Sequence, residues 1–185
     1  MAQDRDRGDK PLLHIEGVTV RFGGIVALDG VSFDVARGQI CGLIGPNGAG
    51  KSTLFNCLSR LYTFSSGRIE FEGQPLASLP RHKMAALGIG RTFQNLALFR
   101  TMTVRDNMLV GAHHLGRTGL LANAVRVPAC AREEAWLGGR VEQLRDLLDL
   151  RSVAGVPVAS LPFGTRKRVE FARALIGGPK LLLLD

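Results

Sequence analysis

Residues 45–52 read Gly45-Pro46-Asn47-Gly48-Ala49-Gly50-Lys51-Ser52, and this stretch decides the fold class. It matches the pattern G-x-x-x-x-G-K-[ST], in which glycines let successive backbone N–H groups turn toward a single anion. The residue frequencies of the chain give roughly 0.006 chance matches to this pattern, so a glycine-rich turn that binds nothing is the weaker interpretation. The stretch therefore predicts a phosphate-binding loop, or P-loop.

The sequence on either side of the loop fits this prediction. The apolar residues 39–44 before it predict a buried strand, and residues 51–61 after it carry apolar side chains at helical spacing. A helix there would direct its positive N-terminus at the phosphates. We expect a nucleotide with Mg²⁺, with Lys51 reaching the β- and γ-phosphates and Ser52 binding the metal. The predicted nucleotide contacts are Gly45, Pro46, Asn47, Gly48, Ala49, Gly50, Lys51, Ser52 and Thr53.

Strand patterns occupy the first third of the chain and helical patterns the middle. Residues 12–22 alternate apolar and polar side chains, which is typical of a strand, whereas residues 133–150 have helical spacing. Residues 113–130 form an irregular insertion by composition. The predicted elements are strands at 12–22, 31–35, 39–44, 67–71 and 181–184 and helices at 51–61, 133–150 and 163–176. This order indicates an α/β fold.

The chain closes on four leucines, residues 181–184, followed by Asp185. Alone this pattern is weak, because any buried strand that ends in a polar residue looks similar. After a P-loop it predicts the strand whose terminal carboxylate lies on the magnesium side, the Walker B strand. We therefore expect Asp185 to be a magnesium ligand.

Composition excludes little. The net charge of +8, from 24 basic and 16 acidic residues, fits nucleic acid, anionic lipid or phosphorylated ligands without choosing among them. No run of 18 apolar residues occurs, and the polar residues 1–10 predict no signal peptide, so we expect any membrane association to come through a partner. Cys41, Cys57 and Cys130 match no zinc or disulfide spacing, and Cys41 is expected to be a buried thiol.

Further features along the chain, in this order, resemble the ABC ATPases. Phe22 follows the first predicted strand, Gln94 ends Arg91-Thr92-Phe93-Gln94, and residues 161–175 are similar to the ABC signature and its helix. The resemblance implies that Phe22 stacks on adenine and that Gln94 senses magnesium and the γ-phosphate. It also implies that Gly164, in the signature, faces nucleotide. By position alone, the alternative is that Phe22 is a packing residue.

The resemblance implies an α/β P-loop NTPase fold of the ABC ATPase type, with a mixed-sheet core and an inserted helical subdomain. On this basis residues 1–11 are a disordered tail, residues 12–94 with 166–185 form the ATP-binding core, and residues 95–165 form the helical and signature subdomain.

The signature departs from the common L-S-G-G-Q. Pro162 replaces the serine, Phe163 the first glycine and Thr165 the glutamine, while Gly164 remains. The serine contact with the γ-phosphate is thereby lost, although backbone N–H groups at the start of the helix could still face a phosphate. A signature of the type L-P-[FY]-G resembles that of the ATP-binding subunits of branched-chain amino acid importers. The resemblance implies coupling of ATP binding and hydrolysis to uptake of branched-chain or related amino acids.

The same resemblance implies partners. A second ABC ATPase subunit, in a homo- or heterodimer, would face this one head to tail, and transmembrane permease subunits would bind the pair. A solute-binding protein would act indirectly, and no direct nucleic-acid contact is expected. The implied location is peripheral, on the cytoplasmic face of the plasma (inner) membrane. The alternative is a non-transport ABC ATPase that acts on nucleic acid or the ribosome, for which the charge of +8 would be the footprint. A small P-loop kinase would leave the signature stretch without an explanation.

The expected catalytic set is Lys51, Gln94 and Asp185. In the family a glutamate follows the Walker B aspartate, and the sequence ends at Asp185. We therefore expect these 185 residues to be C-terminally truncated, to bind nucleotide weakly and not to hydrolyse ATP efficiently. Steady turnover by the purified chain would contradict this expectation. His82, His113 and His114 precede the signature and cannot, by order, replace the later switch histidine.

Overall fold

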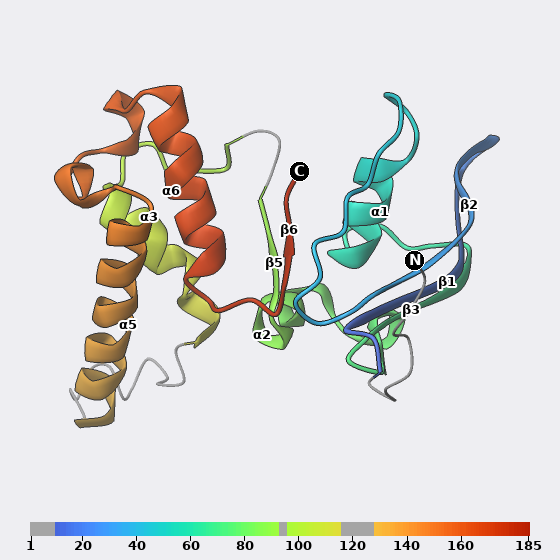
Figure 1. Ribbon diagram of the computed structural model, residues 1–185, viewed down its shortest axis with the longest axis horizontal. Helices are drawn as coiled ribbons and strands as arrows, with labels where there is room; N and C mark the ends of the chain where they lie inside the picture. The colour runs from blue at the N-terminus through green and yellow to red at the C-terminus, as the bar shows by residue number, and fades with distance from the viewer. Residues whose placement is uncertain (1–9, 93–95, 116–127) are drawn as a thin grey trace, which may run out of the picture. The chain divides into compact units, whose positions relative to one another are not determined.

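A computed structural model of the chain describes residues 10–92, 96–115 and 128–185 (Figure 1). The chain forms two compact units, Met1–Met84 and Ala85–Asp185, and each is described by itself. The assignment of residues to an ATP-binding core and a helical subdomain follows function rather than compactness, and it stays a prediction. Most of the predicted tail, residues 1–11, lies outside the described residues.

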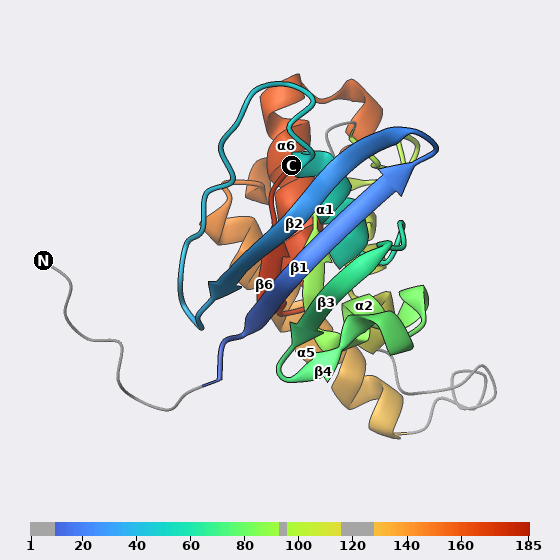
Figure 2. The same ribbon diagram turned by 90° about the vertical axis from the view of Figure 1, so that its right-hand side faces the viewer.

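The described part of the first unit is built on an antiparallel sheet of strand order β2-β1-β3-β4 (Figure 2). Its strands are β1 (Leu13–Phe22), β2 (Ile25–Val35), β3 (Ser66–Phe71) and β4 (Gln74–Pro75). Leu13 pairs with Val35 on one side and with Phe71 on the other. The strands predicted at 12–22 and 67–71 are confirmed. The strand predicted at 31–35 is longer, because a turn at Gly23-Gly24 lets the chain re-pair from Ile25 onward.

The core of this unit follows from strand periodicity. Leu13 and Ile15 are buried, while His14 and Glu16 point to the opposite face, as alternation along a strand requires. Helix α1 (Lys51–Leu58) adds a face of three buried residues, Leu54, Cys57 and Leu58. It ends before Leu61, the predicted end. Short turns of helix then follow at η1 (Leu76–Ser78) and η2 (Arg81–Lys83). Helix α2 (Met84–Leu87) begins at the last residue of this unit and continues into the second.

The strand predicted at residues 39–44 is wrong. This segment has no regular secondary structure, and Ile40 and Ile44 are 98% and 96% exposed. An apolar run becomes a strand only when a neighbour completes its hydrogen-bond ladder, and no described strand pairs with this one. Cys41 is therefore exposed and not buried as predicted, whereas the Cys57 thiol is buried. Burial raises the pKa of the Cys57 thiol, which makes it a poor nucleophile.

In the second unit, helices α3 (Val104–Gly111), α5 (Pro128–Leu147) and α6 (Phe163–Leu175) pack around one apolar core (Figure 1). Helices α3 and α6 approach closely at Gly111, where an added Cβ would lie 2.1 Å from the Arg173 carbonyl oxygen. The buried core residues are Leu98, Val104, Met108, Ala112, Val141, Leu150, Val158, Leu161, Val169, Ala172 and Ile176.

Strands β5 (Ile89–Arg91) and β6 (Leu181–Leu183) form a parallel pair in the same unit. The strand predicted at 181–184 is confirmed, one residue shorter. Short 3₁₀ turns lie at η3 (His113–Leu115), η4 (Arg151–Val153) and η5 (Val158–Ser160). In the described part of the chain, no helix is both long and apolar enough to span a bilayer.

Both long helices predicted for this unit are confirmed, with shifted ends. Helix α5 begins five residues earlier than predicted and ends three residues earlier, at Leu147, while α6 ends one residue earlier, at Leu175. Not every apolar residue of α5 faces the core. Val141 is buried, but Trp136 is 50% and Leu147 73% exposed. The guanidinium of Arg140 lies 5.3 Å from the centre of the Trp136 ring, which gives this exposed ring a favourable neighbour.

Candidate nucleotide site

The glycine-rich loop joins an exposed segment to the first turn of α1. Gly48 and Gly50 adopt φ values of 85° and 82°, in the left-handed region that favours glycine. Gly50 also approaches β2 closely, since a Cβ there would lie 2.4 Å from the Ala27 carbonyl oxygen and 2.6 Å from Leu28 Cδ2. The turn thus needs glycine at position 50 for both backbone conformation and space.

The N-terminus of α1 is open to an anion. Gly50 is the N-cap residue, so among the described residues no side chain caps this helix, and its first turn carries no acidic residue. Residues 45–49 and Ser52 are exposed. The first N–H groups of a helix lack intrahelical acceptors and carry partial positive charge. This loop can therefore present several N–H donors and the Ser52 hydroxyl to one phosphate group.

Lys51 folds back over its own loop. Its Nζ donates to the carbonyl oxygens of Gly45, at 2.7 Å, and of Pro46, at 2.8 Å. The Ala49 N–H also donates to the Pro46 oxygen, at 3.2 Å. These contacts keep the loop curled and hold the ammonium at its mouth. An ammonium has three donors, so Lys51 can add or exchange a phosphate oxygen without leaving the loop.

Phe22 ends β1 and is 46% exposed. Its ring packs edge-on against that of Tyr62, with centroids 5.2 Å apart and an interplanar angle of 75°. A half-exposed aromatic ring held by a second ring is suited to stack on a planar base. Sequence reasoning missed Tyr62, which is 41% exposed and is the one tyrosine of the chain. The available signal was its place just after the helix that follows the P-loop.

Asp185 follows β6 and lies beside the end of β5. Arg91 Nη2 donates to Asp185 Oδ2 at 2.9 Å, and the backbone N–H of Asp185 donates to Thr92 Oγ1 at 3.2 Å. The Arg91 and Asp185 side chains are only 9% and 13% exposed. The stretch Arg91-Thr92-Phe93-Gln94 predicts a functional role for Gln94 only, and none for Arg91 or Thr92. Gln94 itself lies outside the described residues.

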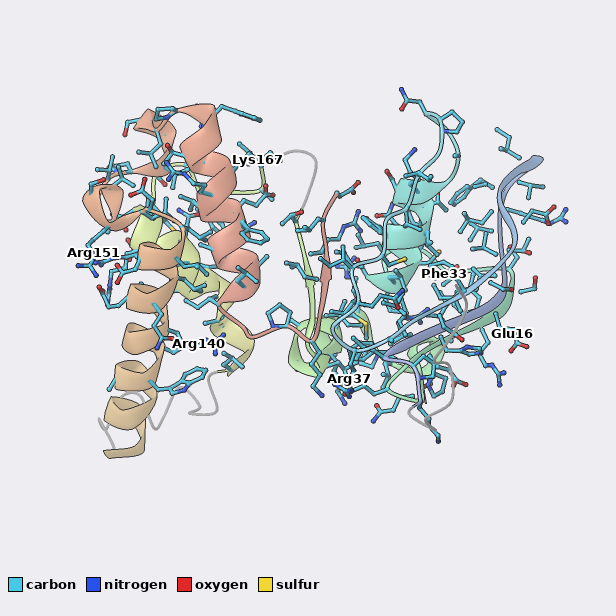
Figure 3. All side chains as sticks on the ribbon, viewed as in Figure 1. Glu16, Phe33, Arg37, Arg140, Arg151 and Lys167 are labelled. Carbon is cyan, nitrogen blue, oxygen red and sulfur yellow. The ribbon has the colours of Figure 1, made fainter. Side chains whose placement is uncertain are left out.

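The signature segment opens α6. Pro162 is the N-cap residue, and it brings no side-chain cap to the described helix. Phe163 is 62% exposed and has Arg166 and Lys167 over its ring, with the charged atoms 6.0 Å and 5.9 Å from its centre (Lys167 is labelled in Figure 3). Gly164 is exposed in the first turn. The start of α6 therefore combines open N–H groups with two cations.

These residues divide between the units. Phe22, Lys51 and Ser52 belong to the first unit, whereas Gly164 and Asp185 belong to the second. Taken separately, the Ser52 hydroxyl and the Asp185 carboxylate are each hard oxygen donors, the type of ligand that Mg²⁺ prefers. Among the described residues, no group of three His, Cys, Asp or Glu side chains lies together in a way that could hold a metal ion.

The sequence matches the family model described as ABC transporter over residues 28–185. The chain belongs to the ABC transporter family, and it has the P-loop fold of that family's ATPases.

The high-affinity branched-chain amino acid transport ATP-binding protein BraF of Pseudomonas aeruginosa is 39% identical, over 95% of this chain and 69% of its own length. The LivG protein of Escherichia coli K12, with the same description, is 38% identical over the same shares. Among solved structures, a nucleotide-free ATP-binding cassette from an ABC transporter superposes with a TM-score of 0.77 at 32% identity, over 95% of this chain and 69% of that one.

Proposed function

We propose that this chain is the ATP-binding subunit of an importer for branched-chain or related amino acids. The observation that carries the proposal is the P-loop, whose glycines, open helix N-terminus and Lys51 ammonium converge on one anion site. The solute class rests on the relatives named above, which share 38–39% identity with the chain.

In this proposal ATP binds with its phosphates on the N–H groups of residues 45–53 and its base on Phe22. Lys51 neutralises the β- and γ-phosphates, and Ser52, Gln94 and Asp185 hold Mg²⁺. The metal, when bound, neutralises charge that develops on the phosphate oxygens. The protein's own contribution is positioning and preorganised positive charge, which is how P-loop enzymes accelerate phosphoryl transfer.

The signature would act on the nucleotide of a second ABC ATPase subunit. Gly164 and the open N–H groups at the start of α6 support this role, because they offer an anion site without the usual serine. Arg166 and Lys167 add positive charge beside it. ATP would close the pair of subunits and hydrolysis would open it. Whether the second subunit is a copy of this chain or a homologue does not alter this scheme.

The chain would work on the cytoplasmic face of the inner membrane, bound to transmembrane permease subunits. A solute-binding protein would deliver amino acid to the permease from the other side. Residues 95–165, the proposed helical and signature subdomain, would carry the docking surface. Within it, Phe99 and Met102 are 48% and 39% exposed, which gives that surface an apolar component.

Uptake tests this function directly. Because the expected catalytic glutamate is not among these 185 residues, they are joined to the residues that follow the Walker B aspartate in LivG. The fusion is expressed with its permease partners in cells that lack their own branched-chain amino acid importers, and uptake of labelled leucine is measured. Lys51→Ala should abolish uptake while the protein still co-purifies with the permease. Lys83→Ala, which removes an exposed lysine from η2 in the same unit, is the matched control and should leave uptake unchanged. Full uptake with Lys51→Ala in the fusion, or none with the unaltered fusion, would overturn the proposal.

A further inference from the structure

A nearly buried ion pair joins the end of β5 to the residue that follows β6. Arg91 Nη2 lies 2.9 Å from Asp185 Oδ2, and the two side chains are 9% and 13% exposed. The pair is formed by residues 94 positions apart in the chain. It involves the carboxylate that the proposed function assigns to magnesium, yet Arg91 itself has no part in that function.

The strand register fixes this pair. In the parallel ladder Arg91 is the partner of Leu183, and the Thr92 N–H donates to the Leu183 carbonyl oxygen at 3.0 Å. The N–H of Asp185 then donates to the Thr92 hydroxyl. Two consecutive residues, Arg91 and Thr92, therefore hold the side chain and the backbone of Asp185 respectively.

Strand β5 is closely packed against the residues just before β6. A Cβ at Gly90 would lie 3.1 Å from Pro179 Cβ and 3.2 Å from the Ala174 carbonyl oxygen. The Lys180 N–H donates to the Gly88 oxygen at 2.8 Å, just before both strands begin. These contacts pack β5 closely against the segment that leads into β6. The backbone of Arg91 is therefore held in a fixed position relative to that of Asp185.

The energetics favour a positioning role over a simple contribution to stability. A charge-assisted hydrogen bond to a carboxylate is short and directional. A largely buried ion pair adds little net stability, because desolvation offsets much of the attraction, but loss of one partner leaves the other charge without compensation. An arginine here is therefore better explained by the orientation that it gives Asp185 than by stability alone.

We propose that Arg91 is a positioning residue for the metal site, and that it holds the Asp185 carboxylate in the orientation that binds Mg²⁺. This inference rests on the proposed function, in which Asp185 is a magnesium ligand. A carboxylate accepts several hydrogen bonds over its two oxygens, so contact with Arg91 and metal coordination are compatible. Groups that orient a metal ligand from behind commonly change metal affinity by about 10- to 100-fold when removed.

The test uses Mn²⁺ as a paramagnetic substitute for Mg²⁺. Binding of Mn²⁺ to the full chain in the presence of ATP is measured by electron paramagnetic resonance, and ATP affinity without metal is measured separately. Arg91→Met should weaken Mn²⁺ binding about 10- to 100-fold and leave metal-free ATP affinity unchanged. Arg91→Lys, which keeps the charge, should recover part of the loss. Arg68→Met removes an arginine that pairs with Glu16 in the first unit and should change neither quantity.

A double-mutant cycle separates positioning from a structural effect. If Arg91 acts through Asp185, Arg91→Met should not weaken Mn²⁺ binding further in a chain that already carries Asp185→Asn. Thermal unfolding of each variant checks that it folds, and Arg91→Lys carries the cycle if Arg91→Met does not. Mn²⁺ binding by Arg91→Met as tight as, or tighter than, that of the unaltered chain would overturn the inference. An equal further loss in the Asp185→Asn background would also overturn it. Unchanged Mn²⁺ binding by Asp185→Asn alone would instead overturn the metal-ligand role in the proposed function.

Discussion

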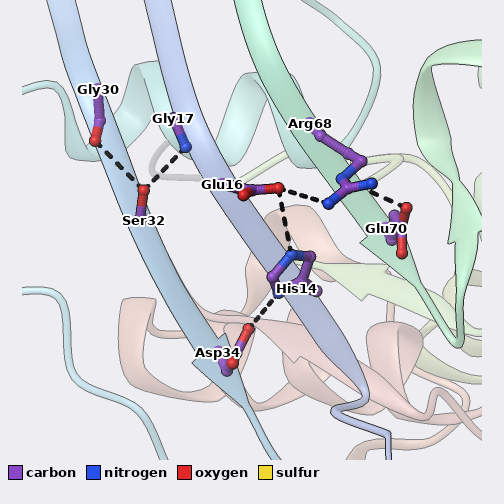
Figure 4. A network of polar contacts seen from close by, with 8 residues as sticks. All are labelled: His14, Glu16, Gly17, Gly30, Ser32, Asp34, Arg68 and Glu70. Carbon is purple, nitrogen blue, oxygen red and sulfur yellow. Dashed lines mark hydrogen bonds and ion pairs between the residues drawn. The ribbon is translucent and has the colours of Figure 1, made fainter.

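His14 lies on the face of β1 opposite the core, in a polar network with residues of both neighbouring strands (Figure 4). Its Nδ1 is 2.6 Å from Asp34 Oδ1 on β2, and its Nε2 is 3.8 Å from Glu16, which also pairs with Arg68 on β3. Cross-strand pairs of opposite charge stabilise a sheet and help to fix its register. The hydrogen bond to Asp34 raises the pKa of His14, and Arg68 opposes this rise.

This network predicts a pH dependence of stability. Because the pKa of His14 is raised on folding, its contribution is fully present below the unfolded-state value of about 6.5 and is lost as pH rises through the higher folded value. Nuclear magnetic resonance should show His14 titrating above that value, and Asp34→Asn should move the titration back toward it. A His14 titration at or below the ordinary value would contradict the prediction.

Gly50 gives a second prediction for a single residue. Gly50→Ala should destabilise the first unit by about 1–3 kcal/mol from backbone strain alone, because φ is 82° there, and the clash with Ala27 adds to this cost. Chemical denaturation measures the loss. Gly73→Ala is the matched control, since φ is 75° there but no atom lies near the added Cβ. A larger effect at Gly73 than at Gly50 would show that the contact with β2 is unimportant.

At the residue scale the sequence predicts side chains whose chemistry is local. Lys51 and the P-loop glycines lie in one continuous stretch, so spacing alone identifies them. Tyr62 and Arg91 could not be found in this way, since each matters through a partner that the fold brings near: Phe22 for Tyr62 and Asp185 for Arg91.

At the scale of elements, the start of α3 is organised by one buried amide. Asn107 Oδ1 accepts from the Phe99 N–H at 2.9 Å, and its Nδ2 donates to the carbonyl oxygens of Phe99 and Thr103, each at 3.0 Å. Thr103 caps the helix, with its hydroxyl accepting from the Asp106 N–H. The amide thus ties the helix to the loop that precedes it.

Asn107→Ala should therefore lower the free energy of unfolding more than a cap mutation does. The substitution removes the acceptor of the Phe99 N–H, which costs about 1–3 kcal/mol, and it also deletes a fully buried side chain, whereas loss of a threonine cap typically costs about 1 kcal/mol. The Phe99 and Thr103 oxygens still accept from the Met102 and Asn107 N–H groups. Urea unfolding of Asn107→Ala and Thr103→Ala compares the two. Equal or reversed effects would mean that the loop finds other partners for its backbone.

Elements also show where periodicity fails. The strand predicted from the alternation of residues 12–22 is confirmed, because β1 has a hydrogen-bonded neighbour on each edge within its own unit, β2 on one side and β3 on the other. The apolar run at residues 39–44 failed because a strand is defined by its partners, which hydropathy does not encode. The helical spacing of residues 133–150 does not show which apolar residues face the core: Trp136 fits the pattern and yet is 50% exposed.

For the whole molecule, binding of MgATP should raise the free energy of unfolding. If MgATP binds the folded chain and not the unfolded one, a concentration 100-fold above the dissociation constant stabilises by about 2.7 kcal/mol. Thermal unfolding with increasing MgATP should show a rising midpoint, and Lys51→Ala should make the rise smaller at each MgATP concentration. A midpoint that does not move with MgATP would contradict nucleotide binding by the folded chain.

The family follows from the order of motifs along the whole chain, and the comparisons confirm it. The division into two compact units after Met84 was not predicted, since it depends on the density of contacts rather than on any motif.

The central claim is that residues 45–53 bind ATP phosphates with Lys51 as the principal cation, and calorimetric titration of ATP tests it most directly. A charged hydrogen-bonding group is worth about 1.5–3 kcal/mol, so Lys51→Ala should weaken ATP affinity by about 10- to 100-fold or more. Lys83→Ala should leave affinity unchanged. Equal ATP affinity of Lys51→Ala and the unaltered chain would contradict the claim.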